Sequence, residues 1–324
     1  MKRKNKSKDA RETTSGLVDI GLISDERLLT EVGKVLLAIS KSGSFAPDNV
    51  LQLPKDSYVY FKQLLKTSCS MDGKNVRPFL VLSYLLDRLG NLTFDEYTYL
   101  LPLCIDKETT LKIAEYIAGS RSGDGRLTDT AGIDDMILRV LMSMDNYRKA
   151  EALFLENEVD RELLRTVGMN RKSRSYDDAY EPLYRKLYEV CFEGKMKSAG
   201  ELYKSTTSFQ NKIGGQWRRL LFDTTSAKAI EKDPARHVKR NGFQEAADER
   251  EFKYLFFRTM HLFKAKSTLS DYQDLNKRYI KNSDTVLFED GMVKFDIVPK
   301  HFFRGRMSRL FSPAFEKAAV VSLN

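Results

Sequence analysis

Apolar residues recur at three- and four-residue steps along much of the chain, and this spacing places them on one face of a helix. The pattern covers residues 17–23, 32–39, 58–66, 78–89, 183–203 and 250–266. Strand patterns are short. The clearest lies in residues 284–298, where two β-prone runs flank Asp290-Gly291, a pair typical of a tight hairpin turn. The expected fold is therefore mainly α with small β-hairpins.

Polar stretches that contain glycine or proline suggest where the chain divides. Three such stretches are predicted to be loops, namely residues 118–132, 170–182 and 229–243. They predict four parts: an N-terminal winged-helix or helix-turn-helix unit (1–118), a middle helical unit (119–232), a second winged-helix-like unit (233–305), and a tail or linker (306–324).

The first segment with the pattern of a nucleic-acid-binding module spans residues 10–37. It runs from a helix through a polar turn and a brief strand at residues 27–29 to a second helix, for which Thr30 is a suitable N-cap. This order is typical of the second half of a winged helix, and the alternative is a surface helix followed by a hairpin. In the winged-helix interpretation Arg11 lies on the recognition helix, with Lys6 and Lys8 just before it.

The second segment, residues 77–104, has the pattern of a helix-turn-helix. Its first helix is expected to end at Gly90, and Thr93 with Glu96 forms a capping box that opens the next helix. That next helix begins with Asp95 and Glu96 and carries no arginine, so we expect it to support the module rather than contact DNA.

The third segment repeats the helix, hairpin, helix order over residues 269–303. Its helix carries Lys277, Arg278 and Lys281 and leads into the predicted hairpin at 284–298. This order predicts a second winged helix whose lysines and arginine contact DNA phosphates. The alternative is a helix and hairpin that serve as a lid or as an interface.

The overall charge favours a polyanionic partner. The 324 residues carry a net charge of +9, with a pI of about 9.2, which suits DNA, RNA or an anionic membrane surface. Further clusters of basic residues are candidate DNA contacts, with an ordinary solvated charge run as the alternative for each: Arg171, Lys172, Arg174, Arg218 and Arg219.

The sequence lacks the features of a secreted or membrane protein. No run approaches the roughly 18 apolar residues needed to cross a bilayer, and no apolar run follows the basic N-terminus. The three cysteines are widely separated and odd in number, so we expect reduced, mostly buried thiols and a cytoplasmic protein.

No strong catalytic motif is present. The three histidines have no partner at ligand spacing, so no zinc or other metal site is predicted. A magnesium-dependent nuclease needs clustered carboxylates and commonly a nearby lysine. One weak window pairs Asp177 or Asp178 with Glu193 and Lys195, and another joins Asp233, Glu251 and Lys253. Helical patterns run through both, and a carboxylate two residues from a lysine points away from it on a helix.

The ordered segments resemble the AlwI-like family of type II, specifically type IIS, restriction endonucleases. The resemblance is carried by "ARETTSGLVDIGLI", "LLTEVGKVLL", "YFKQLLK", "RPFLVLSYLLDRLGNLTFDEYTYLLPLC" and "LSDYQDLNKRYIKNSDTVLFEDGMVKFDIVPKHFF". It implies recognition of a short asymmetric site in double-stranded DNA by winged-helix modules. Cleavage outside that site is then the work of a separate magnesium-dependent nuclease domain.

The family pattern places its nuclease domain after the last winged segment, but this chain ends 21 residues after Phe303. We therefore expect the recognition portion of such an enzyme, truncated before its nuclease domain and without a cofactor, whereas Mg²⁺ is expected for a full-length relative. The expected partners are double-stranded DNA, a separate nuclease subunit and a cognate methyltransferase, with no membrane. The alternatives are a complete endonuclease with its site in the middle unit and a winged-helix regulatory protein.

Overall fold

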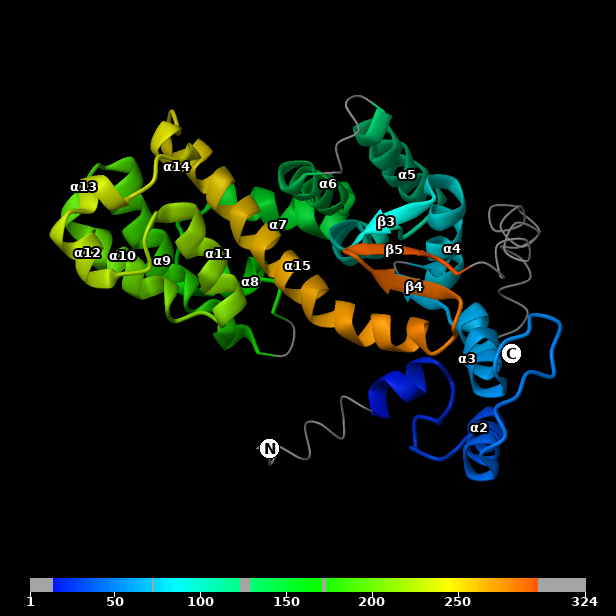
Figure 1. The fold of residues 1–324 in the computed structure, drawn as a ribbon. Helices are drawn as coiled ribbons and strands as arrows, with labels where there is room; N and C mark the ends of the chain where they lie inside the picture. The colour runs from blue at the N-terminus through cyan, green and yellow to red at the C-terminus, as the bar shows by residue number, and fades with distance from the viewer. Residues whose placement is uncertain (1–13, 72, 123–128, 171–172, 297–324) are drawn as a thin grey trace. The chain divides into compact units, whose positions relative to one another are not determined.

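The computed structural model describes residues 14–71, 73–122, 129–170 and 173–296, and it is mainly helical with small antiparallel sheets (Figure 1). The chain divides into two compact units. Unit 1 comprises Met1–Ile133 and Leu269–Asn324, and unit 2 comprises Asp134–Thr268. The chain passes into unit 2 within helix α6 (Thr130–Ser143) and returns to unit 1 within the long helix α15 (Glu249–Lys281).

Helix α4 (Pro78–Leu89) is the centre of the hydrophobic core of unit 1. Proline at its first position suits a helix start, where the backbone N–H would lack a partner. Its Leu82, Leu85 and Leu86 are fully buried. The other elements before unit 2 are α2 (Glu31–Ser42), α3 (Lys55–Lys66), the hairpin β1 (Cys69–Met71) and β2 (Lys74–Val76), the π-helical turn η1 (Glu96–Leu100), the 3₁₀ turn η2 (Leu101–Leu103) and α5 (Lys107–Ser122).

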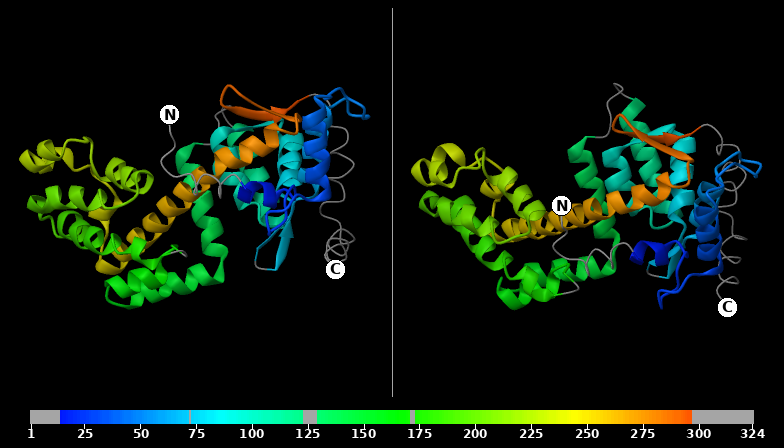
Figure 2. Two further views of the ribbon diagram at one scale, coloured as in Figure 1. Left: turned by 90° about the horizontal axis from the view of Figure 1, so that it is seen from below. Right: turned by 60° about the horizontal axis from the view of Figure 1, so that its bottom comes forward.

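A three-stranded antiparallel sheet joins the two ends of unit 1. Strand β3 (Asn91–Thr93) follows α4 directly, whereas β4 (Val286–Glu289) and β5 (Met292–Phe295) follow α15, and the strand order is β3-β5-β4. The expected Asp-Gly hairpin is confirmed, because Asp290 and Gly291 both have positive φ, 50° and 75°. Figure 2 shows from two further directions that the hairpin continues from the end of α15.

The junction between α4, β3 and η1 is fixed by the predicted capping box. Thr93 Oγ1 accepts from the Glu96 backbone N–H at 3.0 Å, and Glu96 Oε2 accepts from the Thr93 N–H at 2.8 Å. The guanidinium of Arg121, on α5, donates to the same Oε2 at 2.5 Å and to the carbonyl of Asn91 at 3.0 Å. The Glu96 side chain is fully buried, so Arg121 neutralises a charge that has no access to water.

Unit 2 is a helical bundle packed on the first half of α15 (Figure 1). Trp217 is fully buried and stacks on Phe256 of α15 with 5.6 Å between ring centroids. None of the helices within the described ranges is long and apolar enough to cross a membrane. Besides the larger part of α6, the helices of this unit before α15 are α7 (Asp145–Glu156), α8 (Arg161–Val167), α9 (Tyr180–Leu187), α10 (Ala199–Thr206), α11 (Asn211–Leu221), α12 (Ala227–Lys232), α13 (Pro234–His237) and α14 (Gly242–Glu245), with the turns η3 (Arg174–Asp177), η4 (Tyr188–Phe192) and η5 (Met196–Ser198).

The first predicted module forms less sheet than expected. Thr30 is the N-cap of α2, as predicted, because its side chain accepts from Gly33 N–H at 3.1 Å. The strand expected at residues 27–29 is instead an isolated bridge between Ile23 and Leu29. Arg27 has a φ of 66°, which breaks the extended backbone before a second pair can form.

The strand pairing also groups residues differently from the expected order of parts along the chain. Residues 233–305 were expected to form a unit of their own, yet β5 pairs with β3, and Leu92 lies opposite Val293 in that register. Both side chains are fully buried. Burial of this apolar pair draws the hairpin onto the N-terminal segment, and the first half of α15 packs within unit 2.

The buried ion pair predicts a large effect for Arg121→Ala. Removal of the guanidinium leaves the Glu96 carboxylate buried without its cation, so the free energy of unfolding should fall by about 3–5 kcal/mol. Urea-induced unfolding of the full chain, followed by circular dichroism, measures this change. Arg88→Ala is the control, because Arg88 pairs with Glu115 at the surface with 3.8 Å between charged atoms. Arg88→Ala should lower the free energy of unfolding by less than about 1 kcal/mol. Equal effects of the two substitutions would contradict the assignment of Arg121 as the buried cation that pairs with Glu96.

Candidate nucleic-acid interface

The end of α15 carries three predicted DNA contacts, and the structure gives them different surroundings. The ammonium of Lys277 lies 4.8 Å from the ring centroid of Phe94 and 5.5 Å from that of Phe288. These rings belong to the segment after β3 and to β4, so a single cation contacts both parts of the sheet. Lys277 therefore fastens α15 to the hairpin, whatever else it contacts.

The other two basic residues of this helix end are exposed. Arg278 pairs with Asp274 one turn earlier, whereas Lys281 has no ion pair with any described residue. On the hairpin, Lys294 pairs with Glu289 at 3.2 Å, and both side chains are about half exposed. Lys281 is thus the cation of this group that is available to an external anion without breaking an internal contact.

The predicted contacts of unit 2 also separate into bound and exposed side chains. Arg218, on α11, is half-buried and donates to the Thr206 carbonyl at 3.4 Å. Its neighbour Arg219 is exposed, as is Arg174 on the turn η3. Within unit 2, Arg174 and Arg219 therefore remain candidate phosphate contacts, and Arg218 serves mainly to join α11 to the end of α10.

The loop that carries Arg174 is anchored by a buried carboxylate that sequence patterns did not single out for this role. Asp177 is only 1% exposed and accepts from the Asn170 side chain at 2.7 Å. Burial raises the pKa of the Asp177 carboxyl. A charged group and an amide seven positions apart in a polar stretch give no periodic signal.

Five predicted contacts lie outside the described residues, namely Lys6, Lys8, Arg11, Arg171 and Lys172.

The first candidate carboxylate window is occupied by ion pairs. Asp178 accepts from Arg165 at 2.5 Å and 2.8 Å, and these hydrogen bonds hold the pKa of the Asp178 carboxyl below its usual range. The expectation that Glu193 and Lys195 diverge on a helix is wrong, because the helical turn ends at Phe192. Gly194 takes a left-handed φ of 72° and reverses the chain, so Glu193 Oε2 and Lys195 Nζ lie 2.8 Å apart.

The second window has structural roles at each position. Asp233 accepts from the backbone N–H of Arg236 at 3.3 Å and caps the short helix α13. Glu251 accepts from the Ala247 N–H at 2.7 Å, and Lys253 donates to the Asn157 carbonyl at 3.0 Å. Across the part of the chain that the structure describes, no three His, Cys, Asp or Glu side chains are arranged to hold a metal ion.

Histidine and cysteine side chains are mainly packed into the fold. His261 lies in the core of unit 2, where its two ring nitrogens face the carbonyls of Phe257 and Val167 at 2.8 Å and 2.9 Å. Burial lowers the pKa of its imidazole. Cys104 and Cys191 are buried free thiols, as expected, whereas Cys69 is exposed.

The model of the AlwI restriction endonuclease family matches residues 18–322, nearly the whole chain. No curated protein and no solved structure matches this chain.

The surroundings of Lys277 predict that it contributes to stability. Lys277→Ala removes a cation from two aromatic rings, so the free energy of unfolding should fall by about 0.5–2 kcal/mol. Arg278→Ala, at the next position, removes only an exposed ion pair within one helix. It should change the free energy of unfolding by less than about 0.5 kcal/mol. Urea unfolding of both variants checks the difference, and equal midpoints would show that the rings do not hold Lys277 in solution.

Proposed function

Since this chain belongs to the AlwI restriction endonuclease family, we propose that it is a sequence-specific double-stranded DNA-binding protein in which unit 1 carries the recognition module. The observation that carries the proposal is the sheet β3-β5-β4, in which a helix, α15, leads directly into a hairpin whose turn is exposed. Family membership indicates DNA as the substrate class. The sheet holds α15 and the hairpin together, so that both can contact the DNA.

The connections within unit 1 support a proposed single winged helix assembled from two distant segments. In a winged helix, a helix, a short strand and a second helix precede the recognition helix, whose end leads into a hairpin that pairs with the first strand. Here α4, β3 and η1 occupy the first three places, and the last turns of α15 lead into β4 and β5. On this interpretation the second and third predicted segments are one module, with unit 2 inserted between them.

The basic residues divide into two proposed roles. Lys281 and Arg278, exposed at the end of α15, contact phosphates and set the position of the module on the duplex. Arg174 and Arg219 provide further phosphate contacts from unit 2. Arg11, with Lys6 and Lys8 before it, remains the candidate for base recognition, because arginine makes bidentate hydrogen bonds to guanine.

We further propose that Asp178, Glu193 and Lys195 take no part in DNA cleavage. The support is that each side chain is held in an ion pair by a neighbour, and cleavage needs carboxylates that converge on Mg²⁺. The chain then acts as the recognition part of a type IIS system. Mg²⁺-dependent cleavage belongs to a separate nuclease part, and protection of the host site belongs to a methyltransferase.

Binding to random duplex DNA should be strongly salt-dependent. Each phosphate contact contributes about 0.9 to the slope of log K against log salt concentration. Fluorescence anisotropy between 50 mM and 200 mM salt measures the slope, and a flat response would exclude the DNA-binding proposal. Lys281→Ala should lower the slope by about one with an unchanged urea midpoint. Lys34→Ala is the matched control, because Lys34 pairs with Glu31 on α2.

The ion pairs also give an expectation for cleavage assays. Purified chain is incubated with plasmid DNA and Mg²⁺ or Mn²⁺, alongside Asp178→Ala, Glu193→Ala and Glu251→Ala. We expect no nicking or linearisation that depends on any of these carboxylates. Cleavage that Glu193→Ala or Asp178→Ala abolishes, in a variant that still binds DNA, would establish the alternative of a complete endonuclease with its site in unit 2.

A further inference from the structure

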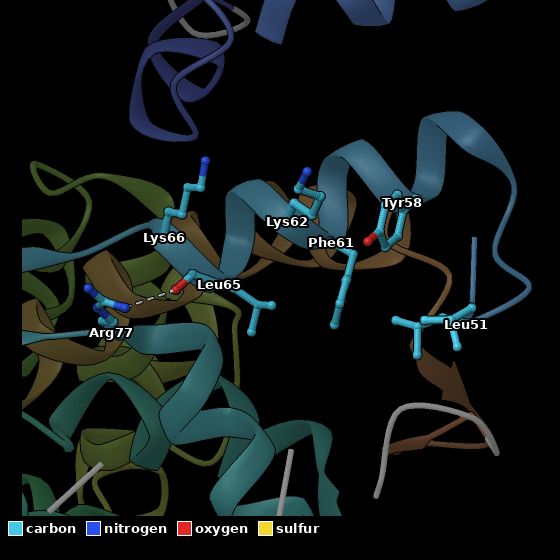
Figure 3. A pocket seen from close by; sticks show the side chains of 8 residues that line it. Leu51, Tyr58, Phe61, Lys62, Leu65, Lys66 and Arg77 are labelled. Carbon is cyan, nitrogen blue, oxygen red and sulfur yellow. Dashed lines mark hydrogen bonds between the residues drawn. The ribbon is translucent and has the colours of Figure 1, made fainter. Parts of the chain in front are cut away.

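A pocket on unit 1, lined by α3, the loop before it and Arg77, combines an apolar wall with cationic side chains (Figure 3). Its volume is about 280 Å³. Helix α3 provides Tyr58, Phe61 and Leu65, and the loop before α3 provides Val50 and Leu51. Tyr58 is half-buried and stacks on the fully buried Phe61, with 6.5 Å between ring centroids, so its ring is a fixed part of the wall.

Among the described residues that line this pocket, the charged side chains are all cations. Lys62, Lys66 and Arg77 line it together with the apolar residues, and none of these described residues is a carboxylate. Figure 3 shows Lys62 and Lys66 extending to the same side of α3, opposite to Phe61 and Leu65. Both lysines are exposed, and neither forms an ion pair with a described residue. The ammonium of Lys62 lies over the Tyr58 ring, 5.6 Å from its centroid, so this cation is already beside the aromatic wall. Like charges one turn apart on a helix repel each other, so this arrangement favours an anionic ligand.

Lys55, at the start of the same helix, behaves differently. Its ammonium pairs with Asp48 of the preceding loop at 3.3 Å. The contrast identifies Lys62 and Lys66 as the cations of α3 that an external anion can reach without competing with a carboxylate of the protein.

The chemistry of the pocket selects among anions. A duplex backbone presents a convex row of phosphates, which would satisfy the lysines but leave an apolar concavity unfilled. A nucleotide whose base is not paired satisfies both parts, because its base has a flat apolar face and its phosphate is charged. Proteins that bind single strands use this combination of an aromatic platform and nearby cations.

We propose that this pocket binds one unpaired nucleotide of the DNA, with its base against Tyr58 and its phosphate against Lys62 and Lys66. The inference rests on the proposed DNA-binding function and adds a second contact surface to it. Arg77 donates to the Leu65 carbonyl at 3.5 Å and thereby ties the end of α3 to the start of α4. It keeps the pocket shape and adds positive charge beside the phosphate.

The test compares two duplexes of equal length, one fully paired and one with a single central mismatch, in anisotropy titrations of the full chain. A mismatched base leaves the stack at lower cost, so the wild type should bind the mismatched duplex more tightly. Tyr58→Ala should reduce the affinity for the mismatched duplex by at least about fivefold and remove the preference, because base stacking on an aromatic ring is lost. Tyr58→Phe keeps the ring and should retain the preference.

The lysines are tested by the double substitution Lys62→Ala with Lys66→Ala, against Lys55→Ala as the matched control. The double variant should lose affinity for the mismatched duplex and lower the salt slope for it by one to two, whereas Lys55→Ala should leave both unchanged. Both lysines are exposed, so circular dichroism should show an unchanged fold.

Three outcomes would overturn the proposal. Equal wild-type affinities for the two duplexes, with no effect of Tyr58→Phe or Tyr58→Ala, would exclude the nucleotide pocket while leaving the DNA-binding function intact. No binding of either duplex would exclude the proposed function as well. Oligomerisation without DNA that the exposed-residue variant Val50→Ser abolishes would show that a second copy of the chain occupies this surface.

Discussion

The buried carboxylate of Glu96 is the constraint on which unit 1 depends. Its Oε2 accepts from the Thr93 backbone and from the Arg121 guanidinium, which also donates to the carbonyl of Asn91. A buried charge requires its partners in place, so the end of α4, the strand β3 and helix α5 are held in one arrangement. Strand β3 is thereby held in place, and the hairpin takes its position from that strand through the pairing of β3 with β5. The position of the proposed recognition surface therefore depends on this buried ion pair rather than on any exposed residue.

Local sequence signals predicted the local structure well. The Thr30 cap, the Thr93 and Glu96 capping box, and the Asp290-Gly291 turn each depend on residues within four positions of one another. Pairing of β3 with β5 could not be predicted in this way. Three residues are too few to show an alternating pattern, and the partner strand lies about 200 positions later. The structure therefore contains one sheet where sequence patterns suggested separate modules.

Formal charge was a weaker guide to the candidate interface. The sequence shows Lys277 and Lys281 as equivalent, yet one lies on two aromatic rings and the other is exposed. Sequence patterns did not single out Lys62 and Lys66 as candidate contacts. Only their surroundings in the fold distinguish them from Lys55, which pairs with Asp48. Electrostatic roles depend on contacts between segments, and side chains of the same kind take different roles according to what the fold places beside them.

The pairing of β3 with β5 also has a consequence for synthesis on the ribosome. Unit 2 is continuous in sequence and can fold as soon as it has emerged, whereas the sheet of unit 1 must wait for residue 295. At 5–20 residues per second, β3 spends about 10–40 s as an unpaired edge in the nascent chain. Exposed edges invite pairing with other chains, and very short edge strands reduce that hazard. The three-residue length of β3 thus suits a strand whose partner is made about 200 residues later.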